Sequence, residues 1–556
     1  MRHGGRILAD QLAIQGVDTI FEVPGESFLA VLDGLYDRND IRTIVGRQEG
    51  GVAMMAEATG KLTGRPGIAF VTRGPGATNA AAGVHIAMQD QTPMVLFVGQ
   101  VGRDARDRDS FQEVDYRRTF APLAKWAAEI DDVRRIPEYV SHAFHLAMAG
   151  RPGPVVLALP EDMLAEAAEV ADALPVGRVE ARPAAEEVVE VARRIAAARR
   201  PLVLIGGGGW SEAARLALER FAAAWQLPVA NGFRCQDYID NLHPCYAGDL
   251  GIGPEPTLLR YVADADLLLA VGTRLDEMTT GDYTRLRPPV PRQELIHVHP
   301  DPNEIGRVYR PTLAVVAGST PFLEAIAALA PPAARPWAGE TAQLHAAHRR
   351  WRYEPDPTPG DLRLSHVVRQ VSDRLAADAI VTSGAGNYAV WVHRYICHRR
   401  FRTQLAPVSG SMGYGLPAAV AAKIRFPERE VVCFAGDGCF QMTMQEFGTA
   451  VQYGAAILVL VVDNGMYGTI RMHQERRYPE RVIGTGLRNP DFAALARAYG
   501  GFGATVRHDD EFLDAFEEAR RSSAPAILHL LVSPEALTPR LTLEAARAEG
   551  LSRRRS

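Results

Sequence analysis

Short runs of β-branched and other apolar residues recur along the whole chain, and each ends on Gly, Asp or Pro before an Ala-rich helical pattern begins. The clearest runs are GIAFVTRGPG, MVLFVGQ, VVLALPED, LVLIGGGG, LLLAVGTR, VVCFAGDG and ILVLVVDNG. Continuous apolar runs of this length are typical of strands buried on both faces, which occur in parallel sheets covered by helices. The pattern therefore predicts an α/β fold built from doubly wound parallel sheets.

Two polar stretches rich in Pro and Ala, near residues 173–188 and 331–360, interrupt this alternation. Stretches of this composition are typical of linkers. A chain of 556 residues is also too long for a single hydrophobic core. We therefore expect three α/β domains and a mobile tail, at residues 1–172, 186–332, 358–540 and 541–556.

The composition is that of an ordinary globular protein, with 23% charged residues and a net charge of −5. This balance gives no basic excess to attract nucleic acid or an anionic membrane surface. The five cysteines form no C-x-x-C pair, so neither a zinc site nor a disulfide framework is indicated, and a reducing cytoplasm fits best. No apolar stretch approaches the roughly 20 residues of a membrane span. We expect a cytoplasmic protein without nucleic-acid or membrane partners.

Two oxygen-bearing side chains follow neighbouring predicted strands near the end of the chain. VVCFA leads into Gly436-Asp437-Gly438, a helical pattern follows, and ILVLVV then leads into Asp463-Asn464. In one βαβ unit, Asp437 and Asn464 can both emerge at the same edge of the sheet. Carboxylate, amide and carbonyl oxygens form the hard ligand shell that Mg²⁺ prefers. The alternative is that Gly-Asp-Gly is a tight turn and Asn464 a helix cap.

The order of strand, GDG, helix, strand and Asn resembles the thiamine-diphosphate-dependent enzymes. SGSMGYGLPAAVAAK, GDGCFQMTMQEF, DNGMYGTIRMHQ and NPDFAALARAYG resemble the C-terminal cofactor domain of the acetohydroxyacid (acetolactate) synthase branch. Upstream, TRGPGATN stands where that family has TSGPGATN, and FQEVD, GRPGPVVLALPED and VGTRLDE follow in the expected order. The resemblance covers nearly the whole chain. It implies a pyrimidine-binding, a central and a diphosphate-binding domain.

The same resemblance implies a set of cofactor contacts. Asp437, Asn464 and the carbonyl of Met466 would hold Mg²⁺ on the cofactor's diphosphate. Met412 would support the cofactor in a bent shape, although from the residues alone it is a core gap-filler. The remaining implied contacts are Asn79, Gly386, Asn387, Gly410, Gly436, Gly438, Cys439, Gly468 and Thr469.

Glu49 stands between a predicted strand, IRTIV, and a helix of small residues that opens at Gly50-Gly51. On its own, an acid at this place is explained by the helix dipole. The resemblance implies a catalytic role, because the chemistry needs a carboxylic acid against N1′ of the cofactor's aminopyrimidine. In the family this acid and the diphosphate site come from different subunits. A homodimer, or a homotetramer, is therefore expected.

Further residues match the substrate region of the synthases. Gln112 and Lys125 are implied to lie near the substrate funnel, although a solvated loop and a helix edge also explain them. His473 stands where the biosynthetic synthases carry a tryptophan, and Met278 stands where they carry an arginine. Both positions are associated in the family with handling the second keto acid, so the second substrate is left open. We predict a catalytic role for His473, which could donate to a polar acceptor; the alternative is that it merely fills space.

The implied activity is decarboxylation of a 2-keto acid, with pyruvate as donor, and ligation to a second carbonyl as in branched-chain amino acid biosynthesis. VGRDARDRDSFQE lacks the paired histidines of pyruvate-decarboxylase-like relatives, which disfavours simple decarboxylation to an aldehyde. Glyoxylate carboligases lack the catalytic acid, whereas this chain has Glu49, so that activity is disfavoured too. One alternative is another thiamine-diphosphate decarboxylase or 2-hydroxyacyl lyase. The other is a catalytically silent paralogue, which Glu49, Asp437 and Asn464 oppose. A regulatory subunit is left open.

The middle unit begins with PLVLIGGGGWSEAARLA, a strand, a glycine turn and a helix. Ser211 stands where a dinucleotide-binding fingerprint has its third glycine, so that interpretation is weak. Gly272, Arg274 and Asp276 match the FAD site of the synthases. However, Gly251-Ile252-Gly253 lacks the histidine of their GMHG element, and Gly318 replaces an acid. We expect no FAD.

Overall fold

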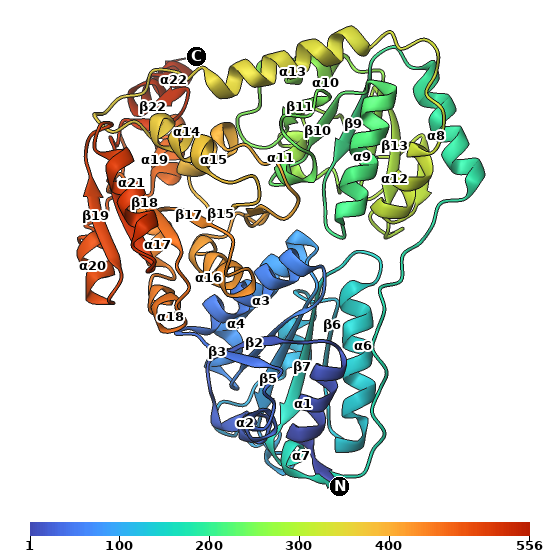
Figure 1. The fold of residues 1–556 in the computed structure, drawn as a ribbon, viewed down its shortest axis with the longest axis vertical. Helices are drawn as coiled ribbons and strands as arrows, with labels where there is room; N and C mark the ends of the chain where they lie inside the picture. Colours follow the sequence, from blue (N-terminus) through green and yellow to red (C-terminus); the bar gives the residue numbers. More distant parts are fainter. Residues whose placement is uncertain (556) are drawn as a thin grey trace. The chain divides into compact units, whose positions relative to one another are not determined.

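The computed structural model describes residues 1–555 and contains three six-stranded sheets (Figure 1). Every pair of neighbouring strands within these sheets runs parallel. Helices follow the strands and cover both faces of each sheet. The predicted α/β class with three doubly wound parallel sheets is confirmed.

The first sheet has the strand order β3-β2-β4-β5-β7-β6. Its strands are β2 (Thr19–Glu22), β3 (Arg42–Val45), β4 (Gly67–Val71), β5 (Met94–Gln100), β6 (Trp126–Glu129) and β7 (Pro154–Pro160). Its helices are α1 (Gly4–Ile14), α2 (Leu29–Tyr36), α3 (Glu49–Thr63), α4 (Pro75–Asp90), α5 (Tyr116–Phe120), α6 (Ile136–Met148) and α7 (Glu161–Ala165). A short antiparallel pair, β1 (Arg2–His3) with β8 (Ala167–Ala168), closes this region.

The apolar spacing of α6 explains how a helix covers this sheet. Its buried residues Ile136, Val140, Ala143, Phe144 and Ala147 recur at the spacing that places side chains on one face of a helix. Together with α1, α2 and α7 they form one core with the apolar side chains of the sheet. Each fully buried Leu, Ile or Phe side chain in such a core contributes roughly 1.5–3 kcal/mol.

The central sheet has the order β11-β10-β9-β12-β13-β14. Its strands are β9 (Pro201–Ile205), β10 (Val229–Asn231), β11 (Tyr246–Asp249), β12 (Leu267–Val271), β13 (Glu294–His299) and β14 (Leu313–Val316). Its helices are α8 (Ala185–Ala197), α9 (Glu212–Trp225), α10 (Pro256–Asp264), α11 (Glu277–Thr280), α12 (Ser319–Ala327) and α13 (Ala338–Tyr353). This order is the one seen in dinucleotide-binding folds.

The turn after β9 is occupied by the indole of Trp210, which donates to the carbonyl of Gly206 at 2.9 Å. Whether a flavin binds here stays a prediction.

The third sheet has the order β16-β15-β17-β18-β20-β19. Its strands are β15 (Ile380–Ser383), β16 (Gln404–Leu405), β17 (Val431–Gly436), β18 (Leu458–Asp463), β19 (Phe502–Val506) and β20 (Ala526–Leu531). The helices that accompany it are α14 (Leu364–Arg374), α15 (Tyr388–Tyr395), α16 (Gly415–Arg425), α17 (Asp437–Gln441), α18 (Glu446–Gln452), α19 (Gly468–Arg477), α20 (Phe492–Ala498) and α21 (Phe512–Arg521).

The first and third sheets share one strand order. Counted along the chain from the first strand of each sheet, both read 2-1-3-4-6-5. In such a sheet the connections after the first and third strands leave in opposite directions, and this switch point is where ligands bind in open α/β folds. The switch points lie between β2 and β4 in the first sheet and between β15 and β17 in the third.

The contacts divide the chain into two compact units. The first contains Met1–Val179 together with two distant segments, Val420–Arg425 and Gln445–Tyr453. The second contains Glu180–Ala419, Phe426–Met444 and the chain from Gly454 onward. The two distant segments of the first unit were not predicted from the sequence. The boundaries expected for three domains stay a prediction.

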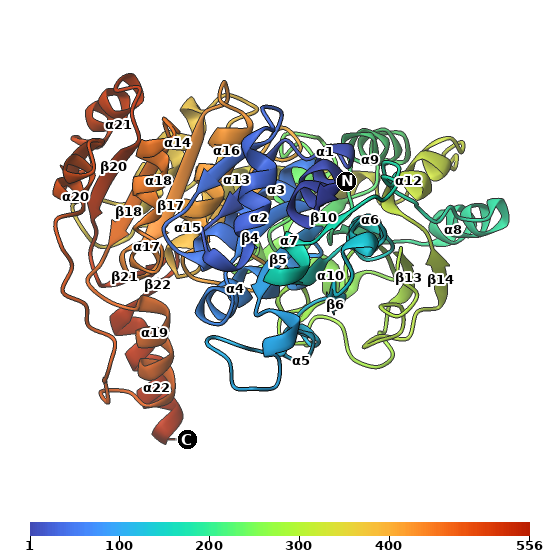
Figure 2. The ribbon, with the colours of Figure 1, turned by 90° about the horizontal axis from the view of Figure 1, so that it is seen from below.

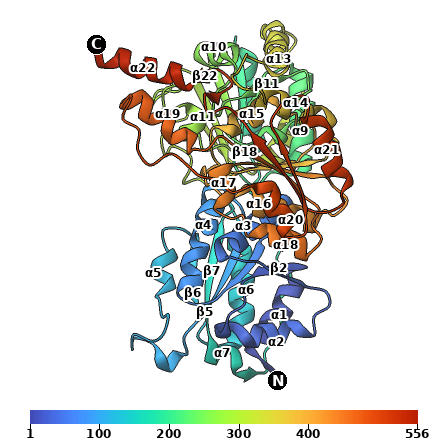
Figure 3. The ribbon, with the colours of Figure 1, turned by 90° about the vertical axis from the view of Figure 1, so that its left-hand side faces the viewer.

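The segment expected as a tail, residues 541–556, contains regular elements, and its mobility stays a prediction. β21 (Ala536–Thr538) and β22 (Leu541–Thr542) pair, and α22 (Leu543–Arg555) packs beside α19 (Figures 2 and 3). Gly550 permits this packing, because an added Cβ would lie 2.2 Å from the carbonyl oxygen of Glu475. Arg547 donates to the buried carboxylate of Glu475 at 2.9 Å. These contacts dock α22 on α19 at Arg547 and Gly550.

No helix within residues 1–555 combines the length and the apolar composition needed to cross a membrane.

Glu22 is a buried carboxylate at the end of β2. The residue is 3% exposed, and its Oε2 has no hydrogen-bond partner. Burial raises the pKa of this carboxyl to about 7 from its ordinary value of 4.5. Between these two values the folded protein holds a proton that the unfolded chain releases, so the free energy of unfolding falls as the pH rises.

We predict that Glu22→Gln removes this loss of stability. The variant is expected to exceed the wild type by roughly 2–3 kcal/mol at pH 8, and this advantage disappears below about pH 4.5, where the carboxyl is protonated in both states. Thermal midpoints measured from pH 4.5 to 8 check the prediction. A stability difference that does not change with pH contradicts it.

Candidate active site

A cavity of about 250 Å³ lies at the switch point of the third sheet, after the ends of β15, β17 and β18. Ser383 ends β15 and Gly436 ends β17, and the two strands are hydrogen-bonded neighbours. All twelve residues expected to contact the cofactor from this part of the chain line the cavity. They are Gly386, Asn387, Gly410, Met412, Gly436, Asp437, Gly438, Cys439, Asn464, Met466, Gly468 and Thr469.

Asp437 is the first residue of α17 and is 3% exposed. Its Oδ2 accepts a hydrogen bond of 2.8 Å from the amide nitrogen of Asn489. The same nitrogen donates to Asp463 Oδ1 at 2.7 Å, and His529 Nε2 lies 2.8 Å from Asp463 Oδ2. A chain of side chains from β18, β20 and the 489 loop therefore fixes the Asp437 carboxylate in the cavity.

The two carboxylates differ in their protonation. Burial raises the pKa of Asp437 to about 6, against the opposing hydrogen bond from Asn489. Burial acts in the same direction on Asp463, but the hydrogen bonds from His529 and from the Gly465 N–H leave its pKa below the ordinary value. Asp463 therefore carries negative charge beside Asp437, at the edge where the expected metal ligands meet.

Asn464 and Asn387 bring two amide groups to the same cavity. Asn464 Oδ1 accepts from the Met466 N–H at 3.2 Å, which curls the chain after β18. Thr469 Oγ1 donates to Asn387 Oδ1 at 2.9 Å and links the start of α19 to the start of α15. These bonds orient both amides from the loops after β15 and β18.

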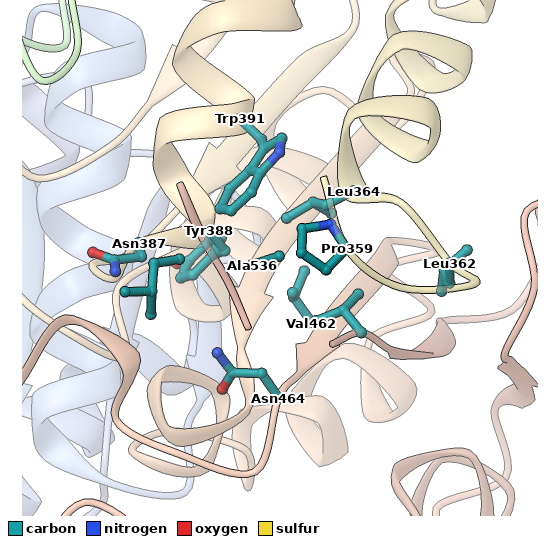
Figure 4. A pocket seen from close by; sticks show the side chains of 11 residues that line it. Pro359, Leu362, Leu364, Asn387, Tyr388, Trp391, Val462, Asn464 and Ala536 are labelled. Atoms are coloured by element: carbon teal, nitrogen blue, oxygen red, sulfur yellow. The ribbon is translucent and has the colours of Figure 1, made fainter. Parts of the chain in front are cut away.

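Behind the two amides lies a smaller cavity of about 30 Å³ (Figure 4). Figure 4 shows Asn387 and Asn464 toward one side of it, and the apolar side chains of Trp391, Leu364 and Pro359 toward the other. The apolar side chains therefore lie behind the two amides, on the side of the domain interior. Met412 packs against the apolar core of this domain and also lines the larger cavity, and its role as a support for the cofactor stays a prediction.

The cavity fits a diphosphate with a hard metal ion. An added Cβ at Gly438 would lie 2.5 Å from the ring of Tyr467, and Gly410 has φ +66°, so larger residues are excluded by contact or by backbone conformation. The backbone can therefore approach a ligand closely at both glycines. The carboxylate of Asp437, the amide of Asn464 and the carbonyl of Met466 supply oxygen donors suited to Mg²⁺.

A central-domain arginine braces two loops of this cavity. Arg234 is 7% exposed and donates to the carbonyl of Gly384 at 2.6 Å and to that of Pro407 at 2.5 Å. Gly384 precedes the Gly386-Asn387 loop, and Pro407 precedes Gly410. The central sheet therefore contributes directly to the shape of the cavity, which the sequence did not predict.

In the first unit, Glu49 begins α3, and its Oε2 accepts from the amide nitrogen of Asn79 on α4 at 2.9 Å. An added Cβ at Gly76 would lie 3.5 Å from Glu49 Oε1, so the first turn of α4 packs against the carboxylate. Glu49 and Asn79, both expected at the cofactor, thus meet at the switch-point edge of the first sheet.

Arg73, which replaces the serine of TSGPGATN, braces the loops at this edge. Its Nη2 donates to Glu26 at 2.6 Å, its Nη1 to Glu161 at 3.1 Å and its Nε to the carbonyl of Phe111 at 3.3 Å. These partners follow β2, β7 and β5. The substitution therefore adds a cation that is already paired with two carboxylates.

Gln112 lies next to this cluster in a left-handed backbone conformation, with φ +63°. An added Cβ at Gly74 would lie 2.8 Å from the Cβ of Gln112, so Gly74 allows the 112 loop to approach the end of β4. The structure therefore brings Gln112 to the same loop cluster as Glu49.

The other two residues expected to be catalytic have different surroundings. Lys125 Nζ donates to the carbonyls of Leu146 and Ala149 at 2.5 and 2.7 Å, at the C-terminal end of α6. His473 is exposed on α19 and does not line the 250 Å³ cavity. Their catalytic roles stay predictions.

Several residues that form these contacts were not predicted from the sequence. Asn489 lies in the quoted NPDF element, so its motif was visible but its bond to Asp437 was not. His529 and Arg234 occur within an apolar strand and an irregular loop, where no local pattern marks them. The departure at Arg73 was the one visible signal, and its partners lie far apart along the chain.

Family models match all three parts of the chain. Residues 2–118 match the thiamine pyrophosphate enzyme N-terminal TPP binding domain, residues 188–326 the central domain and residues 384–530 the C-terminal TPP binding domain. The last match contains the cavity and its twelve lining residues named above.

Curated relatives align with nearly the whole chain. The acetolactate synthase isozyme 2 large subunit of Escherichia coli (strain K12) is 32% identical over 533 residues, 95% of each chain. The acetolactate synthase large subunit of Corynebacterium glutamicum is 32% identical over 96% of this chain and 87% of its own. The mitochondrial acetolactate synthase catalytic subunit of Saccharomyces cerevisiae is 30% identical over 95% of this chain and 80% of its own. The chain therefore belongs to the thiamine-diphosphate-dependent enzymes of the acetolactate synthase family.

Proposed function

We propose that this enzyme decarboxylates pyruvate and joins the remaining two-carbon unit to a second carbonyl compound, with thiamine diphosphate anchored by Mg²⁺. The observation that carries the proposal is the cavity after β15, β17 and β18, where a buried carboxylate, an amide and a backbone carbonyl meet among glycines. Thiamine diphosphate supplies a cationic ring that accepts the electron pair released when CO₂ leaves.

In this proposal each lining residue has a separate task. Asp437, Asn464 and the carbonyl of Met466 hold Mg²⁺, which neutralises diphosphate charge. Asn387 and Thr469, already bonded to each other, present polar atoms to the diphosphate. The glycines at 386, 410, 436, 438 and 468 leave room for it, beside the thiol of Cys439. Met412 supports the bent cofactor.

Glu49 is proposed to exchange a proton with N1′ of the aminopyrimidine. It begins α3, and the amide of Asn79 fixes one of its two oxygens at 2.9 Å, so the other remains for a ligand. A positioned carboxyl of this kind typically contributes 10²–10⁴-fold to rate by general acid–base catalysis. Gln112, Lys125 and His473 are proposed to act on the substrate.

The proposal includes assembly. Glu49 belongs to the first unit and Asp437 to the second, and we propose that a homodimer, alone or paired into a tetramer, completes each site between two chains. Light scattering of the purified protein measures its mass directly. A monomer with full activity contradicts this part of the proposal.

A second candidate is a 2-keto acid decarboxylase or 2-hydroxyacyl lyase. It is favoured by Met278 on α11, which stands where the resemblance has an arginine. No lysine, arginine or histidine is among the lining residues of the 250 Å³ cavity, so this cavity alone offers no cation to a second carboxylate. The products separate the two candidates.

We predict that purified protein supplied with thiamine diphosphate, Mg²⁺ and pyruvate forms acetolactate, identified by mass spectrometry. Acetolactate supports the proposed ligation, and acetaldehyde alone supports the second candidate. The visible spectrum of the same sample tests for flavin, since bound FAD would absorb visible light. Absence of any turnover with pyruvate contradicts pyruvate as the donor.

We predict that Asp437→Ala abolishes Mg²⁺-dependent binding of thiamine diphosphate, because it removes the one charged oxygen donor of the proposed set. Asn489→Ala leaves the donor in place but frees its carboxylate, and is expected to weaken binding by roughly 10–100-fold. Calorimetric titration with and without Mg²⁺ measures both effects. Retained binding in Asp437→Ala would show that the metal is held elsewhere.

We predict that Glu49→Gln lowers kcat by at least about 10²-fold, because the amide keeps the shape of the side chain but cannot exchange the proton. Cofactor affinity should change by less than about tenfold, since the amide still accepts the hydrogen bond of Asn79. Steady-state kinetics and calorimetry on the same samples separate the two quantities. Turnover within a few-fold of wild type would remove Glu49 from the proton transfer.

A further inference from the structure

Glu446 supports the turn that precedes Glu49. It begins α18, which follows the third domain's β17 along the chain but belongs to the first compact unit (Figure 1). The residue is fully buried, at 0% exposure. Its Oε1 and Oε2 accept the Arg47 N–H at 3.1 and 3.2 Å, two residues before Glu49. The Thr449 hydroxyl donates to Oε2 at 2.7 Å and fixes the rotation of the carboxylate.

A glycine makes this approach possible. An added Cβ at Gly51 would lie 2.7 Å from Glu446 Oε1 and 2.9 Å from its carboxyl carbon, so no other residue fits there without moving the carboxylate. Gly51 is in the first turn of α3, and its N–H donates to the side chain of Gln48 at 3.1 Å. Glu446 therefore touches the chain on both sides of Glu49.

The electrostatics favour the same placement. The first N–H groups of a helix have no partner within the helix, and its N-terminal end attracts negative charge. Glu446 brings a carboxylate from a distant segment to the beginning of α3, where Gln48 is the N-cap. Fixing the peptide at Arg47 and the first turn at Gly51 restricts the direction in which Glu49 leaves the backbone.

Two other residues attach the same segment to the first sheet without touching the 48–51 turn. The hydroxyl of Tyr453 accepts the Val45 N–H at 2.8 Å, and Gln452 Oε1 accepts from the guanidinium of Arg47 at 2.5 Å. Tyr453 thus holds α18 on the end of β3. It offers a matched control for docking of the segment alone.

We infer that Glu446 is a positioning residue for catalysis, holding the backbone around Glu49 so that its carboxyl meets N1′ of the aminopyrimidine. The inference rests on the proton-transfer role proposed for Glu49. Glu446 itself contacts neither cofactor nor substrate in this role. It acts through the geometry of the turn.

The test compares Glu446→Ala, Glu446→Gln and Tyr453→Phe. In cofactor-free protein, residue-resolved amide hydrogen exchange at 47–51 reports whether the turn is held, separately from Val45, which bonds to Tyr453. Glu446→Ala is expected to speed exchange at Arg47 by at least about tenfold. In the holoenzyme it should lower kcat by about 10²-fold, with KM for pyruvate within about threefold, because a displaced acid slows the chemical step and not substrate binding.

Glu446→Gln keeps an acceptor oxygen for the Arg47 N–H and nearly the same volume, so it should restore most of the protection and most of the turnover. Tyr453→Phe should speed exchange at Val45 and lower the thermal midpoint, with kcat within about twofold of wild type.

Unchanged exchange and unchanged kcat in Glu446→Ala would overturn the inference. So would equal losses in Glu446→Ala and Tyr453→Phe, since docking of α18 would then explain both. Loss of turnover in Glu446→Gln with normal exchange would show that the charge of Glu446 acts, and not the position it imposes. If Glu49→Gln were fully active, the proposed function of Glu49 would fail, and the exchange data would still decide whether Glu446 holds the turn.

Discussion

Burial of the parallel strands on both faces is the constraint from which the arrangement of this enzyme follows. Burying an unpaired polar side chain between two helical layers is costly, so polar groups gather at the ends of the strands. Glu22, Asp437, Asp463 and Asn464 all stand at or next to such an end. Because all six strands of a sheet run in one direction, their carboxyl ends lie along one edge. The polar side chains that follow the strands are therefore close to one another at that edge.

Much of this arrangement was predictable. The apolar runs located the strands, since a short run rich in β-branched residues that closes on Gly or Asp, such as VVCFA or LVLVV, is typical of a buried strand. The Gly-Asp-Gly and Asp-Asn pairs after them predicted an oxygen-rich edge, and their spacing placed both on one βαβ unit. The residues at 386–387 and 410–412 were found only by resemblance to a family, because a glycine-rich loop has no local signature for the ligand that it meets.

The rest depends on contacts between segments far apart in the chain. Asn489, His529 and Arg234 are polar residues whose purpose is visible only when their partners are known. The docking of the last helix is of the same kind, because Gly550 and Arg547 contact α19 through partners that no local pattern marks. A sequence pattern reports the spacing of apolar and polar residues within one helix or strand. A hydrogen bond between two distant elements produces no such spacing in either of them.

The common strand order of the first and third sheets has a consequence for stoichiometry. Each chain carries one copy of the acid-bearing edge, with Glu49, and one copy of the proposed metal-binding edge, with Asp437. If every acid-bearing edge must combine with one metal-binding edge, a closed assembly of any size contains as many complete centres as chains, and no chain is left with an unmatched half. In a hybrid dimer of a Glu49 variant and an Asp437 variant, one such centre would receive both defects and the other neither, so complementation between two inactive proteins becomes a property of the architecture.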